Sequence, residues 1–146
     1  MTNEQIFRIL IQDGFSKGDV SVFDEYTSPE FIEHQYGMDP QNVEGVKRSI
    51  RYLHRAFPDF SLVIEDIVAS GDRVWGRMTG RGTQKGQFGP MPPTGKKMEI
   101  TVIDIMRFKE GRLVEHWGVP YRLAAMEQLG MKAPPKFIVK LMTFFK

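Results

Sequence analysis

The feature that most constrains the fold is a change in hydrophobic period near residue 60. Before it, apolar residues recur every three to four positions, as on the buried side of a helix. From Phe60 onward apolar and polar residues alternate, as in strands with one buried face. Ser70-Gly71-Asp72 and Lys109-Glu110-Gly111 supply turns between these strands. Helices followed by antiparallel strands predict an α+β fold.

The elements expected along the chain follow from these patterns and from local start and stop signals. Thr2 and Gln5 form a capping-box signature, Asn42 begins a later helix, and Pro58 ends it. The expected helices are 2–18, 19–28, 42–57 and a short one at 123–129, with a brief extended piece at 31–36. The expected strands are 60–69, 73–83, 98–108 and 113–119.

A curved antiparallel sheet wrapped over the N-terminal helices is the architecture that these elements predict. Such a sheet forms a cone-shaped half-barrel with a central pocket, and a pocket in a short domain usually holds a small organic molecule. The stretch 84–97, rich in Gly and Pro, is a loop long enough to act as a lid or a partner contact.

Composition narrows the classes of function. At 146 residues the chain is most simply one domain, which we place at 1–130. The absence of cysteine excludes disulfides and thiolate metal sites, and no pair of histidines has metal-ligand spacing. A net charge of +2 with mixed signs favours a solvated surface over nucleic-acid binding. Without a secretion signal or a spanning apolar run, we expect a cytoplasmic protein.

The segment 131–146 is a basic apolar C-terminal extension. It carries four lysines and no acid, mixed with large apolar residues. It fits a helix docked on the body of the protein or on a partner chain better than a helix lying on a membrane, which is the alternative.

Asp104 is the most unusual charged residue of the predicted sheet. It lies in an otherwise apolar strand and alternates in phase with Val102 and Met106. A carboxylate on a buried face is costly unless it is paired or functional. The alternative is an edge or outward Asp104 paired with an arginine.

Several segments, in order and with compatible spacing, carry a resemblance to a known family. They include Phe31-Ile32-Glu33-His34, Ala56-Phe57-Pro58-Asp59-Phe60, Gly82-Thr83-Gln84, and Arg107-Phe108-Lys109-Glu110-Gly111-Arg112-Leu113-Val114-Glu115-His116-Trp117. In these the chain resembles the SnoaL-like polyketide cyclases, within the nuclear-transport-factor-2-like superfold. The resemblance implies an α+β barrel, commonly dimeric, with a pocket for a small hydrophobic molecule. Characterised members close aromatic polyketide rings by an aldol reaction without a cofactor.

Two positions differ from the family pattern. Tyr121 stands where the family usually has an acidic acid/base residue, and Gln84 stands where it usually has a histidine. Both differences remove a group that titrates usefully near neutral pH.

Aldol closure needs a base for a proton next to a carbonyl and donors for the resulting enolate. We therefore expect His34 and Asp104 to titrate, with Tyr121 and Arg107 as donors. The residues expected to bind the ligand are Trp75, Arg77, Met78, Phe88, Met106, Arg107 and Trp117. Trp75 and Trp117 fit either the cavity or a dimer face, and His116 is expected to point opposite Trp117.

Three functions stay open. The first is a cofactor-free enzyme that performs proton transfer or aldol-type cyclisation on a hydrophobic, carbonyl-bearing molecule. The second is a non-catalytic small-ligand binder on the same scaffold. The third is a homodimerising module whose tail docks a partner. We expect a homodimer and no metal or cofactor in each case.

Overall fold

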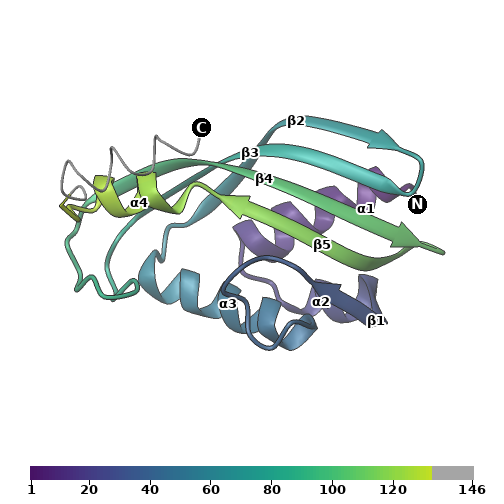
Figure 1. The fold of residues 1–146 in the computed structure, drawn as a ribbon, viewed down its shortest axis with the longest axis horizontal. Coiled ribbons are helices and arrows are strands. Elements are labelled where there is room, and N and C mark those ends of the chain that lie inside the picture. Colours follow the sequence, from purple (N-terminus) through teal and green to yellow (C-terminus); the bar gives the residue numbers. More distant parts are fainter. Residues whose placement is uncertain (133–146) are drawn as a thin grey trace, which may run out of the picture.

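Helices cover one face of a curved five-stranded sheet in the computed structural model, which describes residues 1–132 (Figure 1). The helical elements are α1 (Asn3–Ile9), the π-helical η1 (Leu10–Ser16), α2 (Ser21–Tyr26), α3 (Val43–Ala56) and α4 (Arg122–Gln128). The strands are β1 (Thr27–Glu33), β2 (Ser61–Ser70), β3 (Arg73–Thr83), β4 (Lys97–Lys109) and β5 (Arg112–Pro120). The predicted α+β class is confirmed, and the described strands do not close into a barrel.

The strand order is β1-β5-β4-β3-β2. The last four strands form the expected antiparallel meander. β1 differs from the expectation of an antiparallel sheet, because it pairs with β5 in parallel and sets Glu33 opposite His116. Pro29 lies within β1, where it is tolerated because β1 is an edge strand.

The helix start signals act as the sequence predicts. Thr2 and Gln5 form a complete capping box on α1. The Asn42 side chain accepts hydrogen bonds from the amides of Glu44 and Gly45 and so caps α3. The first predicted helix is present but changes type along its length. Its second half, η1, is a π-helix, which has wider turns than an α-helix.

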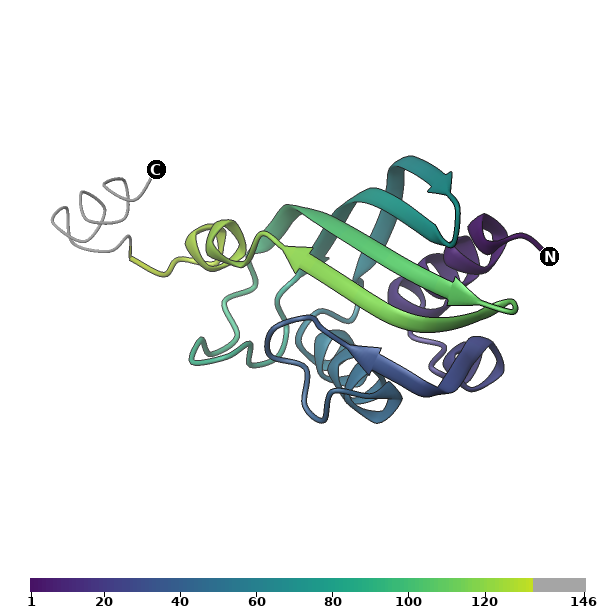
Figure 2. The same cartoon turned by 45° about the vertical axis from the view of Figure 1, so that its right-hand side comes forward.

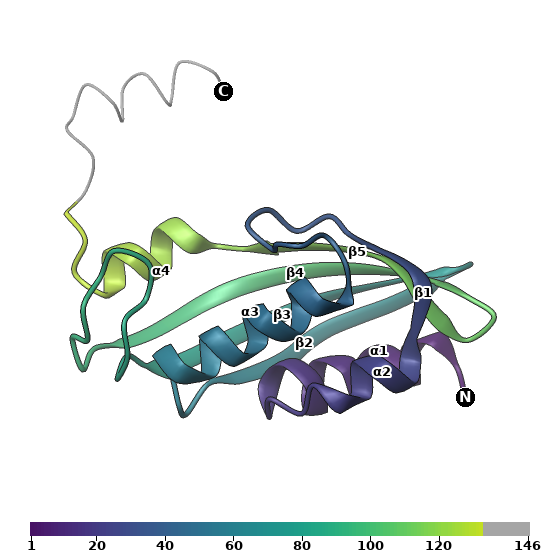
Figure 3. The same ribbon diagram turned by 90° about the horizontal axis from the view of Figure 1, so that it is seen from below.

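The end of the sheet nearest α1 is filled by the hydrophobic core. Figure 3 shows α1, α2 and α3 beneath the same face of the sheet. Phe7, Met78 and Met106 are fully buried there. A Cβ on Gly76 would come within 2.6 Å of the Phe7 ring, so this glycine lets α1 approach the sheet closely.

The other end of the sheet is covered differently. There α4 and the loop between β3 and β4 extend beyond α3, while β4 and β5 curve over it (Figure 2). No helix among residues 1–132 is long and apolar enough to cross a membrane. The predicted extension at 131–146 lies, apart from its first two residues, outside the described residues.

Candidate functional site

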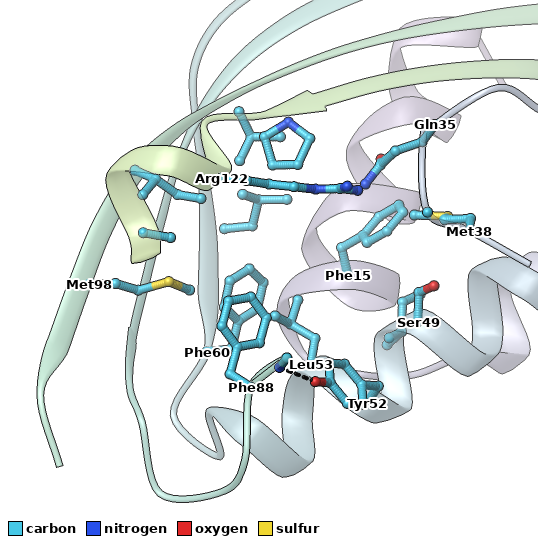
Figure 4. A pocket seen from close by; sticks show the side chains of 18 of the residues that line it. Phe15, Gln35, Met38, Ser49, Tyr52, Leu53, Phe60, Phe88, Met98 and Arg122 are labelled. Atoms are coloured by element: carbon cyan, nitrogen blue, oxygen red, sulfur yellow. Dashed lines mark hydrogen bonds between the residues drawn. The ribbon is translucent and has the colours of Figure 1, made fainter. Parts of the chain in front are cut away.

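A cavity of about 440 Å³ lies between the inner face of the sheet, α3, α4 and the β3–β4 loop (Figure 4). Most of its wall is apolar. The apolar side chains that line it come from η1, α3, β2, β4, α4, three loops and the end of β5. They are Phe15, Met38, Ile50, Leu53, Phe60, Leu62, Phe88, Met98, Ile100, Val102, Pro120, Ala125 and Met126. A volume of this order suits a small organic molecule with two or three fused rings.

The polar side chains in the wall are few. Gln35 follows β1, Asp104 lies in β4, and Arg122 begins α4. Ser49 and Tyr52 lie along α3. Of the described residues that line the cavity, only Asp104 is acidic and only Arg122 is basic.

Asp104 belongs to a buried ionic cluster with His116 and Glu33. His116 Nδ1 lies 2.7 Å and 3.0 Å from the two carboxylate oxygens of Glu33. His116 Nε2 lies 3.3 Å from Asp104 Oδ2, within ion-pair distance but not aligned as a hydrogen bond. All three residues are at most 3% exposed. The cluster therefore depends on the register of β1, β5 and β4.

The His116 ring is held in its charged form. Burial alone would lower its pKa, but the carboxylates of Asp104 and Glu33 outweigh burial and raise it to about 10. At neutral pH the cluster thus contains an imidazolium between two acids. Its Asp104 end reaches the cavity wall.

One oxygen of Asp104 is left without a partner. Oδ1 is buried and makes no hydrogen bond with any described residue. It lies 3.0 Å from the position that a Cβ on Gly118 would take, and Gln35 Oε1 occupies that same space. Gly118 therefore admits the Gln35 side chain next to Asp104. An unpaired buried acceptor in a cavity wall fits a ligand that supplies a proton.

Gln84 organises the β3–β4 loop. Its buried amide nitrogen donates to the carbonyls of Gly86, Met91 and Pro92 at 3.1–3.2 Å. Its Oε1 accepts from Thr94 Oγ1 at 2.6 Å. This structural role explains how an amide can stand at the position where the family pattern has a histidine.

The same loop carries the cavity's apolar cap. Phe88 packs edge-on against Phe57, with ring centroids 5.1 Å apart. The Gly89 amide donates to Tyr52 Oη at 2.5 Å and so fastens the loop to α3. Figure 4 shows this bond beside the Phe88 ring.

Two of the residues that the sequence nominated line the cavity, namely Asp104 and Phe88. Met78 and Met106 face the same side of the sheet but lie in the filled core. The remaining nominated residues lie on or beside the outer face of the sheet and are absent from the cavity wall: His34, Trp75, Arg77, Arg107, Trp117 and Tyr121.

On the outer face His34 and Trp117 stack, with ring centroids 4.8 Å apart. His34 Nε2 also lies 3.2 Å from Glu115, which receives a 2.5 Å bond from Arg107. The Arg107 bond is the main reason that the pKa of Glu115 is lowered. This network is separated from Asp104 by the sheet itself, because His116 and Trp117 point to opposite faces as expected.

Trp75, Arg77 and Tyr121 are also removed from the cavity. Trp75 is 46% exposed on the outer face and Tyr121 is 59% exposed at the start of α4. Arg77 pairs with Asp66 at 2.6 Å across β2 and β3. The structure therefore does not bring the nominated residues together at one place.

Four residues in or near the cavity wall were not predicted as site residues from the sequence: Glu33, Gln35, His116 and Arg122. Glu33 and His116 could have been linked only through the parallel β1–β5 pairing. Gln35 and Arg122 follow the ends of strands, where periodicity gives no signal. Within residues 1–132, no group of three or more acidic or histidine side chains is arranged to hold a metal ion.

Comparison with known proteins connects this arrangement to a family. The family model for SnoaL-like polyketide cyclase matches residues 6–129. The structure is similar to TsrD from Streptomyces laurentii, with 28% identity, a TM-score of 0.78, and coverage of 87% of this chain and 93% of that one. It is also similar to IdmH from Streptomyces antibioticus, with 29% identity, a TM-score of 0.79, and coverage of 90% and 100%. No curated protein matches the chain significantly.

Proposed function

Because the chain belongs to the SnoaL-like polyketide cyclase family, we propose that it catalyses cofactor-free proton transfer leading to aldol-type ring closure. The substrate is a hydrophobic, carbonyl-bearing molecule of polyketide-like size. The observation that carries this proposal is Asp104, a carboxylate that lines a mostly apolar cavity and whose buried Oδ1 has no hydrogen-bond partner among the described residues.

The chemistry assigned to Asp104 is that of a general base. Its Oδ1 accepts a proton from a carbon next to a carbonyl, the C–H bond breaks, and the electron pair moves to the carbonyl oxygen as an enolate. The enolate carbon then attacks a second carbonyl of the same molecule and forms the C–C bond. The alkoxide that results takes up a proton, which Asp104 can return.

His116 and Glu33 act behind Asp104 as positioning residues. The imidazolium, 3.3 Å from Asp104 Oδ2, offsets the charge of the carboxylate and fixes its orientation. Glu33 fixes the ring through Nδ1. This division leaves Oδ1 for the substrate. Asp104 thus supplies an acid at a different point of the sheet from Tyr121, where the family pattern places one.

Deuterium exchange tests the proposal without knowledge of the natural substrate. 2-Tetralone is a bicyclic ketone of the size class that a cavity of about 440 Å³ suits, and its binding is first established by ligand-detected NMR. We expect wild-type protein in D2O to accelerate exchange of its α-hydrogens, and Asp104→Asn to remove the acceleration. Asp66→Asn, on the exposed side of β2, is the matched control. Bound ketone that exchanges no faster than in buffer contradicts catalysis and favours the non-catalytic binder.

The outer face of the sheet supports a second element of the proposal, a homodimer. Val68, Trp75, Ile105 and Trp117 are aligned across β2, β3, β4 and β5. Val68 and Trp75 are 59% and 46% exposed, and Val119 nearby is 67% exposed. An apolar row of this length on one face is typical of a surface that a second copy covers.

Sedimentation velocity tests the dimer. We expect wild-type protein to sediment as a dimer and Trp75→Lys to sediment as a monomer with an unchanged circular dichroism spectrum. Lys109→Ala, at the exposed end of β4, serves as the control. A wild-type monomer at high micromolar concentration contradicts this part of the proposal.

A further inference from the structure

Arg122 is the cation that lines the cavity, and the residues around it keep it there. Its Nη2 donates to the carbonyl of Tyr36. Its guanidinium carbon lies 5.6 Å from the centroid of the Tyr36 ring, close enough for a cation–π contact. These two contacts set the direction of the side chain. In Figure 4 the guanidinium extends across the cavity toward Gln35.

Gly37 leaves room for the guanidinium group of Arg122. Its φ of 88° is in the left-handed region that favours glycine. A Cβ there would lie 3.2 Å and 3.3 Å from the two terminal guanidinium nitrogens, so a side chain at this position would press on Arg122. The backbone after β1 is therefore shaped to accept the arginine.

Arg122 is an exposed residue, and the described residues take up little of its hydrogen-bonding capacity. A guanidinium has five N–H donors, and the Tyr36 carbonyl takes one of them. No carboxylate of the described residues forms an ion pair with Arg122, whereas Arg77 and Arg81 each have one such partner and Arg107 has two. Arg122 thus has donors available for an anionic or partly charged oxygen in the cavity.

The charges around the cavity show where such an oxygen is needed. Two acidic side chains, Glu33 and Asp104, stand with two basic ones, His116 and Arg122. When Asp104 takes a proton from a bound molecule, its negative charge passes to an oxygen of that molecule. Arg122 is the cavity-lining cation that can compensate the charge in its new position.

We propose that Arg122, with Gln35 beside it, binds the oxygen that becomes negative when Asp104 removes a proton. The ligand class is accordingly a hydrophobic 1,3-dicarbonyl or hydroxyaryl ketone, whose enolate or phenolate oxygen faces Arg122 while its ring system occupies the apolar wall. This inference rests on the proposed proton transfer, and it adds a specificity-determining residue that contacts the reacting oxygen.

A chromogenic phenol tests the inference by a readout other than turnover. The probe is 6-cyano-2-naphthol, whose phenol and phenolate differ in absorbance. We expect wild-type protein to lower the pKa of the bound probe relative to the free probe. Arg122→Gln should raise the bound pKa by about one unit, a tenfold change in the phenolate-to-phenol ratio, and Arg122→Lys should recover part of the difference.

Two further variants make the result decisive. Arg48→Gln is the matched control, since Arg48 also donates to a backbone carbonyl, that of Asp39, but does not line the cavity. Asp104→Asn should abolish tetralone exchange yet favour the bound phenolate, because it removes the neighbouring negative charge. The same bound pKa in wild type, Arg122→Gln and Arg122→Lys overturns the role of Arg122. If the pKa of the bound naphthol depends on Arg122 as expected but tetralone exchange is not accelerated, only the proposed catalysis is overturned.

Discussion

His116 Nε2 lies 3.3 Å from Asp104 Oδ2, and neither side chain is more than 4% exposed. The other ring nitrogen is engaged by Glu33. A single histidine therefore neutralises part of the charge of two buried carboxylates. Both the stability of the sheet and the availability of Asp104 depend on it.

Replacing His116 should destabilise the fold strongly. His116→Phe leaves Glu33 and Asp104 buried without their cation, and breaking a buried ion pair in this way costs about 3–5 kcal/mol. Urea unfolding followed by tryptophan fluorescence measures the loss. His34→Phe is the control, because its ion pair with Glu115 is partly exposed and should contribute less than about 1 kcal/mol. Equal losses in the two variants would contradict the importance of the cluster.

The protonation of His116 should persist well above neutral pH. The groups that face the ring are Glu33 from β1, Asp104 from β4 and the uncharged ring of Phe15 from η1. The pKa of about 10 in the folded protein compares with 6.5 for an ordinary histidine. Stability from this proton is thus fully present below pH 6.5 and is lost as the pH rises toward 10. Ring resonances of His116 followed by NMR should not titrate below pH 8, and a midpoint between pH 6 and 7 would contradict the prediction.

Gly118→Ala should damage the polar end of the cavity without unfolding the protein. The new methyl group would overlap Gln35 Oε1 and crowd Asp104 Oδ1. Gln35 can move because only its flexible end is in the way, so we expect weaker naphthol binding by about tenfold with a stability loss below about 1.5 kcal/mol. Isothermal titration calorimetry gives the affinity. In a Gln35→Ala background the same substitution should cost less, and an undiminished cost would contradict the proposed clash.

Gln84→Leu should release the β3–β4 loop. The carbonyls of Gly86 and Pro92 lose their Gln84 donor, while that of Met91 keeps the Phe88 amide, and each unsatisfied acceptor costs on the order of 1–3 kcal/mol before water enters. Hydrogen exchange at the Phe88 and Gly95 amides should accelerate. Gln87→Leu is the matched control, since its exposed amide donates only to the carbonyl of Gly89. Unchanged exchange in Gln84→Leu would show that the loop is held by other contacts.

Tyr52→Phe should loosen the same loop at its tip alone. The substitution removes the acceptor of the Gly89 amide but keeps the ring near Phe88. We expect faster association and dissociation of the naphthol with little change in affinity, measured by stopped-flow fluorescence. Unaltered rates would mean that ligands enter by another route.

The fold was predictable where a local signal specifies a local structure. The capping residues Thr2 and Asn42 act at the expected helix starts, and the alternation in β4 put Asp104 in phase with Val102 and Met106, a face that the structure shows to be the buried one. The parallel place of β1 was not predictable, because a short edge strand with a proline carries no sign of its partner. The cluster depends on that pairing, so it could not be foreseen either.

The site was predictable only in part, for the same reason. Asp104 stood out because a charge among apolar residues has few explanations. His34 and His116 could not be distinguished as partners of an acid without knowing which strand lies beside β5. Arg122 and Gln35 meet across loops, where sequence spacing and spatial distance are unrelated.

The wall of the cavity comes from two independent sources. Asp104 and the His116–Glu33 pair behind it are fixed by pairing among β1, β4 and β5, whereas much of the apolar lining comes from α3, α4 and the β3–β4 loop. Substitutions at Ile50, Leu53 or Met126 can therefore change the shape of the cavity for a bound molecule and leave Asp104 and His116 in place. A lineage built on this scaffold can therefore come to bind new molecules by single mutations while it keeps the same buried cluster of Asp104, His116 and Glu33.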